Sequence, residues 1–304
     1  MLNNYDINRT VLSPIIALVL MLCLLSGCNS EQTNPDHIVD ENTHGYYFDV
    51  YTAESKDQPR NSIMEMSSFD DELFFEIQNS AQERQFAVKV LVDYEQVQFI
   101  VDGIERNTYL LDAEANITKI CGFRLAEPLD TAYNHTLTVI LIAGSDILTN
   151  KTDFEMSDHY SLSYNYLLQF GDSIPIFQSG QLPAETELVT EYQSEGLLFN
   201  TDTENRSRVI PDRELIAMPG DTIHLQYQVG GYEGVNDVVI VASLGLEQGD
   251  INGKPYLYCF TEKGALVRGT ASITAPMETG EYEFMAWVLP NPFSPEENEF
   301  IMLD

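Results

Sequence analysis

The sequence has few basic side chains. Fifteen Lys and Arg residues stand against 48 Asp and Glu, which gives a formal net charge of -33 over 304 residues. Nucleic-acid binding needs clustered Lys and Arg, so this composition argues against a nucleic-acid partner. The same shortage disfavours electrostatic docking to anionic lipid. Hydrophobic residues still make up 44% of the chain, enough for buried cores and too many for wholesale disorder.

Cysteine is also scarce, with four residues in the chain. Cys23 and Cys28 lie near the N-terminus, which leaves Cys121 and Cys259 for the rest of the chain. The sequence therefore has no disulfide framework, and whether these two pair stays open. Neither lies in a CxxC motif, which argues against a zinc site.

We expect no cofactor, and calcium is the one ion that the sequence leaves open. Oxygen-bearing side chains alternate around Asp202 and Glu204, and the segment with Asp250 and Asn252 resembles the first half of a calcium loop. Neither segment has the Glu that closes an EF-hand. Asx-rich hairpin turns have the same composition, so both interpretations stay open.

Catalytic motifs are absent. The sequence contains no Gly-x-Ser-x-Gly, Ser-x-x-Lys or His-Glu-x-x-His, and no two of its five histidines have metal-ligand spacing on one element. We therefore expect no enzymatic activity. A catalytic triad assembles in space from distant residues, so an envelope hydrolase stays as the least favoured alternative.

Long apolar runs are limited to one segment. Every residue from Ile15 to Leu25 is apolar, too short a run to cross a bilayer core of roughly 30 Å and typical of a signal peptide. The next residues, Leu25-Ser26-Gly27-Cys28, resemble the lipobox of bacterial lipoproteins. This resemblance implies a signal peptide over 1–27, diacylglycerol and a palmitate-like acyl chain on Cys28, and an anchor on the outer face of a bacterial membrane. Residues 28–43 are polar and are expected to form a disordered tether.

Two halves of the remaining chain share short patterns in the same order, with offsets between 147 and 152 residues. This indicates a duplicated domain, with domain 1 over 44–170, a linker over 171–190 and domain 2 over 191–304. The charge divides evenly, with -14 for residues 44–172 and -15 for 173–304. The matches, first half then second half, are 45–49 with 196–200, 71–75 with 221–225, 94–96 with 246–248, 109–111 with 256–258, Gly122 with Gly269, and 128–131 with 276–279.

Short runs rich in Val, Ile, Tyr, Phe and Thr alternate with turn residues, and no segment has a helical pattern. The chain is therefore expected to be all-β, with two tandem immunoglobulin-like β-sandwiches. The expected strands are 45–52, 71–78, 85–92, 96–102, 107–111, 119–125, 136–143 and 160–169 in domain 1, and 195–200, 206–210, 215–218, 221–229, 236–243, 255–260, 266–274, 281–288 and 298–303 in domain 2.

The segment 276–284 resembles the corner between the fifth and sixth strands of immunoglobulin-like domains. In such a corner an aromatic side chain locks the turn, and Tyr282 would have this role in domain 2. Tyr133 or His135 would have it in domain 1. On the strands that follow the corners, the residues expected to face inward are Leu137, Val139 and Leu141 in domain 1, and Phe284, Ala286 and Val288 in domain 2. The resemblance does not extend to the Cys-Trp-Cys core of antibody domains. Of the residues after the turn at 219–220, Ile223, Leu225 and Tyr227 should face the core and His224 the solvent.

Two aromatic residues are candidate ligand contacts. Tyr232 lies in a glycine-rich loop, and Trp287, the one Trp, has the strand parity of an outward residue. The alternatives are a tight turn for the loop, and a core or inter-domain position for Trp287. We expect a non-catalytic, lipid-anchored envelope protein with a binding or structural role and a protein or cell-wall partner. An accessory or chaperone-like subunit that presents a sheet edge to a partner is the alternative.

Overall fold

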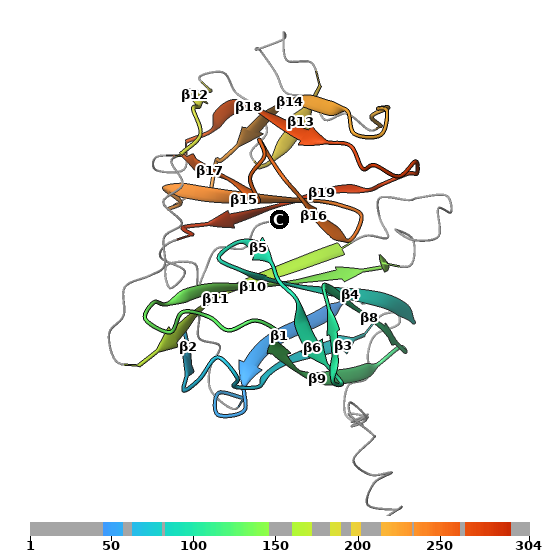
Figure 1. Cartoon of the computed structure of the whole chain (residues 1–304), viewed down its shortest axis with the longest axis vertical. Coiled ribbons are helices and arrows are strands. Elements are labelled where there is room, and N and C mark those ends of the chain that lie inside the picture. The colour runs from blue at the N-terminus through green and yellow to red at the C-terminus, as the bar shows by residue number, and fades with distance from the viewer. Residues whose placement is uncertain are drawn as a thin grey trace, which may run out of the picture.

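The structure is a computed structural model that describes residues 45–56, 63–80, 83–145, 160–171, 183–189, 196–201, 214–232, 234–261 and 265–292. These residues form strands joined by turns, so the all-β expectation is confirmed. Figure 1 shows two bodies, domain 1 in blue and green below and domain 2 in orange and red above. Among the described residues, no helix has the length and hydrophobicity needed to cross a bilayer.

Domain 1 is a sandwich of two sheets. The first has the strand order β1-β3-β9-β6-β7, and the second has the order β2-β11-β10-β4-β5, with β8 also paired to β4. This is the immunoglobulin arrangement, with strands A-B-E-D in one sheet and G-F-C in the other. The strands are β1 (Tyr46–Thr52), β2 (Ile63–Met66), β3 (Leu73–Asn79), β4 (Arg84–Val92), β5 (Glu95–Gln96), β6 (Phe99–Val101), β7 (Ile104–Arg106), β8 (Thr108–Ala113), β9 (Ile117–Leu125), β10 (His135–Ala143) and β11 (Tyr160–Phe170).

Domain 2 repeats this plan in its described part. One sheet has the order β12-β18-β14-β13, and in the other β15 pairs with β16, β17 and β19. The two-residue strand β12 lies within the expected linker and pairs with the first residues of β18. It lies on the side of β18 that corresponds to the β6 side of β9, whereas β6 pairs with the last residues of β9. The strands are β12 (Glu187–Leu188), β13 (Leu198–Asn200), β14 (Thr222–Val229), β15 (Asp237–Leu244), β16 (Glu247–Gly249), β17 (Tyr256–Phe260), β18 (Val267–Thr274) and β19 (Phe284–Pro290).

Some strand predictions differ from the structure. Residues 215–218 form no strand, and the side chain of Ile216 is 93% exposed, so its apolar character was misread as a sign of pairing. Strand β2 was missed because it is short and pairs parallel to β11, far along the chain. The predicted strands 206–210 and 298–303 lie outside the described residues.

Each sandwich has its own core. Phe48, Phe75 and Phe123 are buried between the sheets of domain 1. Leu225 and Tyr227 belong to the core of domain 2, with Ile223 packed at its edge and His224 exposed, as the alternation predicted. The inward sides predicted for the two strands after the corners are also confirmed: Leu137, Val139 and Leu141 in β10, and Phe284, Ala286 and Val288 in β19.

Strand registers give the correspondence between the domains. Val92 pairs with Glu95 and with Leu137 in domain 1, just as Leu244 pairs with Glu247 and with Phe284 in domain 2. By these registers, β4 is equivalent to β15, β10 to β19, and β8 to β17. The same strand plan with the same registers is what a duplicated domain requires.

Two of the sequence matches need correction. Tyr109 pairs with Val88 and Leu257 with Ile240, so Tyr109 is equivalent to Leu257 and not to Tyr256. Gly122 lies against Glu72 on the outer side of its sheet, whereas Gly269 lies against the core residue Tyr227. The two glycines therefore face opposite sides and are not equivalent, because the alignment by turns ignored strand parity.

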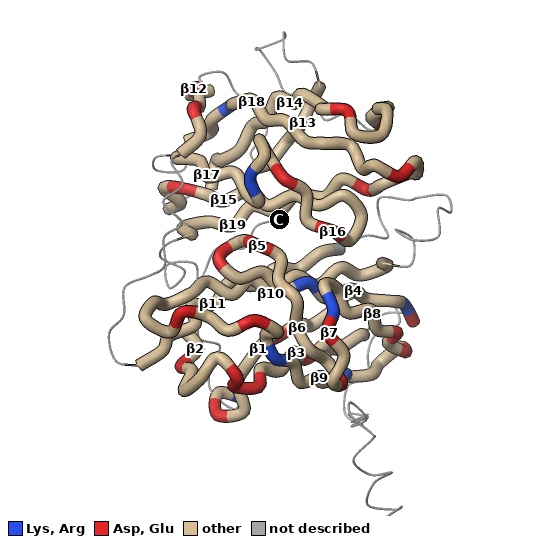
Figure 2. The backbone as a smooth tube through the Cα atoms, in the orientation of Figure 1, with Lys and Arg blue, Asp and Glu red and all other residues tan. Residues whose placement is uncertain are grey.

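The two sandwiches stack face to face. The sheets containing β4 and β10 in domain 1 and β15 and β19 in domain 2 lie in the middle, and the other sheet of each domain lies outside (Figure 1). Asp and Glu positions are spread over both domains, with Lys and Arg few in each (Figure 2). The acidity therefore belongs to both bodies and not to one of them.

Candidate functional site: the domain junction

The surface between the domains is a third apolar cluster. Side chains on β4 and β10 that point away from the domain 1 core meet side chains on β15, β17 and β19 that point away from the domain 2 core. Alternation along each strand provides both faces, one for the sandwich and one for the junction. The buried members are Ala87, Leu91, Tyr94, Ile140 and Ile142 from domain 1, and Val239, Val241, Tyr256, Tyr258, Trp287 and Leu289 from domain 2.

Gln96 and Gln248 join the edges of the two central sheets. The backbone N–H of Gln96 donates to Oε1 of Gln248 at 2.5 Å, and the backbone N–H of Gln248 donates to Oε1 of Gln96 at 2.8 Å. The two residues are 152 positions apart and hold equivalent places in β5 and β16. A contact in which equivalent residues exchange the same bonds is isologous, as in a two-fold dimer.

The side-chain amides of the same residues repeat this symmetry. Nε2 of Gln96 donates to the carbonyl of Leu246 at 3.5 Å, and Nε2 of Gln248 donates to the carbonyl of the equivalent residue, Tyr94, at 2.8 Å. Each amide also donates within its own domain, to the carbonyl of Asn107 or Pro255. The junction therefore has an approximate two-fold axis near this glutamine pair.

Lys89 breaks the symmetry. It lies on β4 at the position that Val241 holds on β15, is 2% exposed, and places Nζ 5.2 Å from the ring centroid of Trp287. Burial lowers the pKa of Lys89 to about 8, partly opposed by Glu247. The Lys89 ammonium is thus held in a low-dielectric contact by an aromatic face, which partly replaces its lost hydration.

Further hydrogen bonds and one ring contact join the two domains near the glutamine pair and Lys89. Tyr94 Oη donates to the carbonyl of Pro292 at 2.5 Å, and its ring meets that of Tyr256 edge to face at 5.5 Å. Nε1 of Trp287 donates to Oγ of Ser161 at 3.1 Å. The polar atoms of these large side chains therefore have partners, as buried polar groups require.

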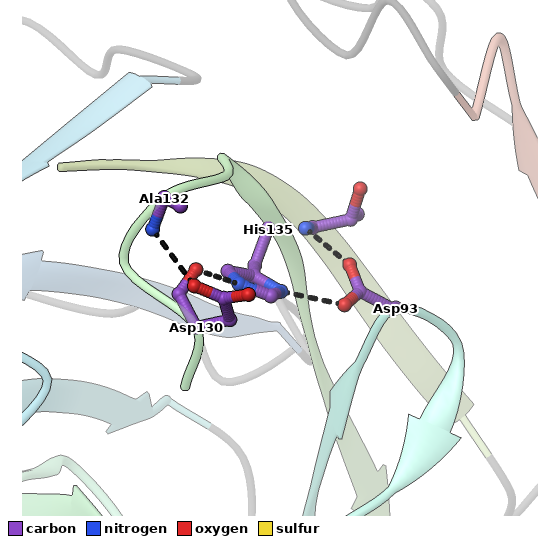
Figure 3. A network of polar contacts seen from close by, with 5 residues as sticks. Asp93, Asp130, Ala132 and His135 are labelled. Carbon is purple, nitrogen blue, oxygen red and sulfur yellow. Dashed lines mark hydrogen bonds and ion pairs between the residues drawn. The ribbon is translucent and has the colours of Figure 1, made fainter. Parts of the chain in front are cut away.

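A His–Asp pair lies at one end of domain 1 (Figure 3). Nδ1 of His135 lies 2.6 Å from Oδ2 of Asp93, and Nε2 lies 3.0 Å from the backbone oxygen of Asp130. Asp93 also accepts the N–H of Thr136 at 3.0 Å. Both atoms that face the imidazole accept hydrogen bonds, so the ring is best satisfied with a proton on each nitrogen.

The electrostatics agree with a protonated ring. Burial opposes the charge, but the hydrogen bonds to Asp93 and to the Asp130 carbonyl outweigh it and raise the pKa of His135 above its ordinary value. A ring with both nitrogens engaged has no lone pair to accept a proton from a substrate. The pair therefore acts as a structural lock and lacks the geometry of a general base.

His135 and Tyr282 both make the backbone contact that was predicted for the aromatic residue at the corner. Tyr282 Oη donates to the carbonyl of Glu278 at 3.1 Å, which confirms its predicted role. The registers of β10 and β19 make His135 equivalent to Tyr282, and His135 contacts a backbone carbonyl upstream in the same way. Of the two domain 1 candidates, His135 therefore holds the corner, and Tyr133 is 41% exposed.

The predicted ligand contacts have other positions. Trp287 is buried in the junction, which is the inter-domain alternative. Tyr232 is half-buried and packs against one end of the domain 2 core, at the turn closed by the bond from the Val235 N–H to its carbonyl. Neither residue presents the exposed ring that a sugar platform needs.

The structure describes two of the four calcium candidates, Asp250 and Asn252. Asp202 and Glu204 lie outside the described residues. Asn252 has φ 56° in a tight turn, and its Oδ1 accepts hydrogen bonds from the N–H and Oγ of Ser272. Asp250 is exposed and lines a polar cavity of about 220 Å³ beside the glutamine pair. Among the described residues, no three His, Cys, Asp or Glu side chains are grouped to hold a metal ion.

The two described cysteines are buried and form no disulfide. Cys121 belongs to the domain 1 core and Cys259 to the domain 2 core, so they do not pair with each other. Burial raises the pKa of the Cys259 thiol to about 11, beside the Tyr227 hydroxyl at 3.4 Å. Cys28, the proposed lipidation site, lies outside the described residues.

No protein-family model matches the chain, and no curated protein matches it. Solved structures that resemble it include the Salmonella enterica SafA pilin in complex with the SafB chaperone, at 12% identity and TM-score 0.26, over 81% of this chain and 98% of that one. The major pilin subunit BcpA of Bacillus cereus matches at 8% identity and TM-score 0.25, over 84% and 65%. Red sea bream transglutaminase matches at 9% and 0.22, over 82% of this chain and 30% of the transglutaminase. Likenesses at this level assign no function to the chain.

Apart from Trp287, sequence reasoning missed the residues that make the junction. Lys89 reads as one charge on an alternating strand, Gln96 as the first residue of the expected strand 96–102, and Gln248 as a residue between two expected strands. The duplication could have found the glutamines, because 94–96 and 246–248 were matched at the offset of 152. Nothing in the pattern says that equivalent residues meet.

Proposed function

We propose that this protein is a lipid-anchored, non-catalytic component of the bacterial cell envelope with a structural or binding role. The observation that carries the proposal is the domain junction. Each sandwich uses one sheet face to hold the other, so the two domains form one continuous body with four sheets. Such a body is suited to present its outer surfaces at a fixed distance from an anchor.

The non-catalytic part of the proposal rests on the chemistry of the described residues. The one His–Asp pair with the spacing of a catalytic dyad has both imidazole nitrogens on acceptors. The nearby cavity of about 210 Å³ is lined by Val92, Leu125 and Leu129 together with carboxylates, among them Asp93. No histidine or hydroxyl group lines it to act as base or nucleophile, which disfavours the hydrolase alternative.

The anchor rests on the sequence alone. Leu25-Ser26-Gly27-Cys28 provides the acceptor thiol, and residues 28–43 provide a polar spacer between the lipid and the first strand at Tyr46. A protein of net charge -33 is repelled by anionic headgroups. Stable attachment to the outer face of such a membrane therefore calls for covalent lipid, and two or more acyl chains provide it.

Metabolic labelling with an alkyne fatty acid tests the anchor. The parent chain should take up label and remain in the membrane fraction after a high-salt wash. Cys28→Ser should lose both the label and the membrane association, whereas Cys23→Ser, in the segment removed with the signal, should behave as the parent. An unlabelled parent chain, or a labelled and membrane-bound Cys28→Ser, would overturn the proposal.

A further inference from the structure

We propose that the junction can also form between two copies of this chain, so that the junction face of domain 1 in one copy binds the junction face of domain 2 in another. The partner is a second copy of the same protein, held by an interface that already exists within each chain. The reciprocal bonds of Gln96 and Gln248 show that this interface has the isologous form of a two-fold dimer. Nothing in its contacts depends on the two faces belonging to one chain.

The sizes of the side chains decide which faces fit together. At four equivalent strand positions, domain 1 has the smaller residue and domain 2 the larger one. The pairs are Ala87 and Val239, Thr108 and Tyr256, Leu110 and Tyr258, and Ile140 and Trp287. At three other positions the order is reversed, with Lys89 equivalent to Val241, Leu91 to Ser243 and Tyr94 to Leu246. The two faces therefore differ position by position, and a contact between two identical faces would not reproduce the packing of a domain 1 face against a domain 2 face.

Lys89 also favours the contact between a domain 1 face and a domain 2 face over the contact between two domain 1 faces. Against domain 2 it lies over the ring of Trp287. In a contact between two domain 1 faces, the place of Trp287 would be taken by the equivalent residue Ile140, and two lysines would be buried near one axis. A buried charge without its partner strongly disfavours a contact, so Lys89 acts against the pairing of identical faces.

Within one chain the junction is favoured by proximity. Two modules on one chain see each other at an effective concentration on the order of 1 mM, well above the concentration of most proteins in solution. The isolated protein in dilute solution is therefore monomeric. Exchange between copies becomes competitive where copies are concentrated, as on a membrane surface, or where the contact within the chain is blocked.

Complementation between two full-length variants, purified in detergent, tests this directly. Ala87→Arg/Ile142→Arg places two arginines on the domain 1 face, and Val239→Arg/Leu289→Arg places them at the equivalent cross-strand pair on the domain 2 face. Each variant keeps one intact face, on the domain that was not altered. The cores of the sandwiches are separate clusters, so the unaltered domain does not rely on the substituted residues for its packing.

A tagged copy of one variant should capture an untagged copy of the other in a 1:1 complex of twice the mass. Tagged and untagged copies of the same variant serve as the controls and should not associate beyond the level set by shared micelles. In the mixture, the emission of Trp287 in Ala87→Arg/Ile142→Arg should shift to the blue, because the domain 1 face of the other variant covers it. Capture no greater than in the controls would overturn the proposal. Equal association within either single variant would overturn the choice of faces.

Discussion

Gln96 and Gln248 each donate a backbone N–H to the side-chain oxygen of the other, which makes them the centre of a two-fold-like contact inside one chain. Gln96→Ala removes the bond that its own side-chain oxygen accepts and leaves its backbone N–H to donate to Gln248, and Gln248→Ala does the converse. Because the two bonds join the same pair of sheet edges, loss of one should weaken the other, so the two residues should be coupled. Gln96→Ala and Gln248→Ala should each lower the free energy of unfolding by about 1–2 kcal/mol, and the double variant should cost clearly less than their sum. Urea unfolding of the four proteins in the cycle measures this coupling. Additive costs would mean that the two bonds act independently of each other, which would contradict this coupling.

Lys89 should be a destabilising residue at neutral pH. Because burial lowers its pKa to about 8, the unfolded chain binds its proton more tightly than the folded chain does. Stability should therefore rise as the pH increases from about 8 towards the unfolded value of about 10.4. Lys89→Met keeps the apolar stem without the charge, and should raise the free energy of unfolding at pH 7 by about 1–3 kcal/mol.

The pH dependence separates this explanation from a simple packing effect. The difference in stability between Lys89→Met and the parent chain should shrink between pH 7 and 9.5 in urea unfolding experiments. A difference that stays constant over this range would show that Lys89 is not charged in an apolar contact.

His135 should give the opposite pH dependence. Its pKa is raised in the folded protein by the hydrogen bonds to Asp93 and to the Asp130 carbonyl, which outweigh the effect of burial. Its contribution to stability is therefore complete below the unfolded value of about 6.5 and is lost as the pH rises through the higher folded value. His135→Tyr introduces the residue that domain 2 has at this position and should remove this dependence, while leaving Asp93 without its cation.

Urea unfolding from pH 5 to 8.5 compares His135→Tyr with the parent chain. The parent should lose stability relative to the variant as the pH increases. A parallel pair of curves would mean that the ring is not protonated in the fold.

The two glycines that the sequence matched should respond differently to alanine. A Cβ at Gly269 would lie 2.4 Å from Oη and 2.5 Å from Cζ of the core residue Tyr227, so Gly269→Ala should cost about 1–3 kcal/mol by overpacking. A Cβ at Gly122 would meet only the flexible carboxylate end of Glu72, at 2.9 Å. Gly122→Ala should therefore be close to neutral in thermal unfolding. Equal losses of stability in the two variants would contradict the assigned strand parity.

The sequence predicted the parts of the fold that depend on residues close together along the chain. Alternation along 136–143 and 281–288 gave the inward residues of β10 and β19, and the Pro276 turn gave the lock at Tyr282. It did not predict which residues meet across the junction. The outward face of β4, with Ala87, Lys89 and Leu91, has the same alternation as any solvated face, since the burial of that side depends on a second domain.

The candidate site was predicted in a different form. Trp287 was offered both as a ligand platform and as an inter-domain residue, and its parity was right for either. Only the position of domain 1 distinguishes the two, and no short pattern encodes that position. The hairpin at Asn252 shows the same limit, because a turn and half of a calcium loop share their residues until the contact with Ser272 is known.

The emission of Trp287 tests the central claim most directly, because the chain has one Trp and it lies between the two domains at 6% exposure. Fluorescence with acrylamide quenching should find a buried, protected indole in the parent chain. In Ala87→Arg/Ile142→Arg, where both substitutions lie on the other domain, it should find a red-shifted and readily quenched one. A Trp287 that is water-exposed in the parent chain, or that stays protected in this variant, would contradict the face-to-face junction.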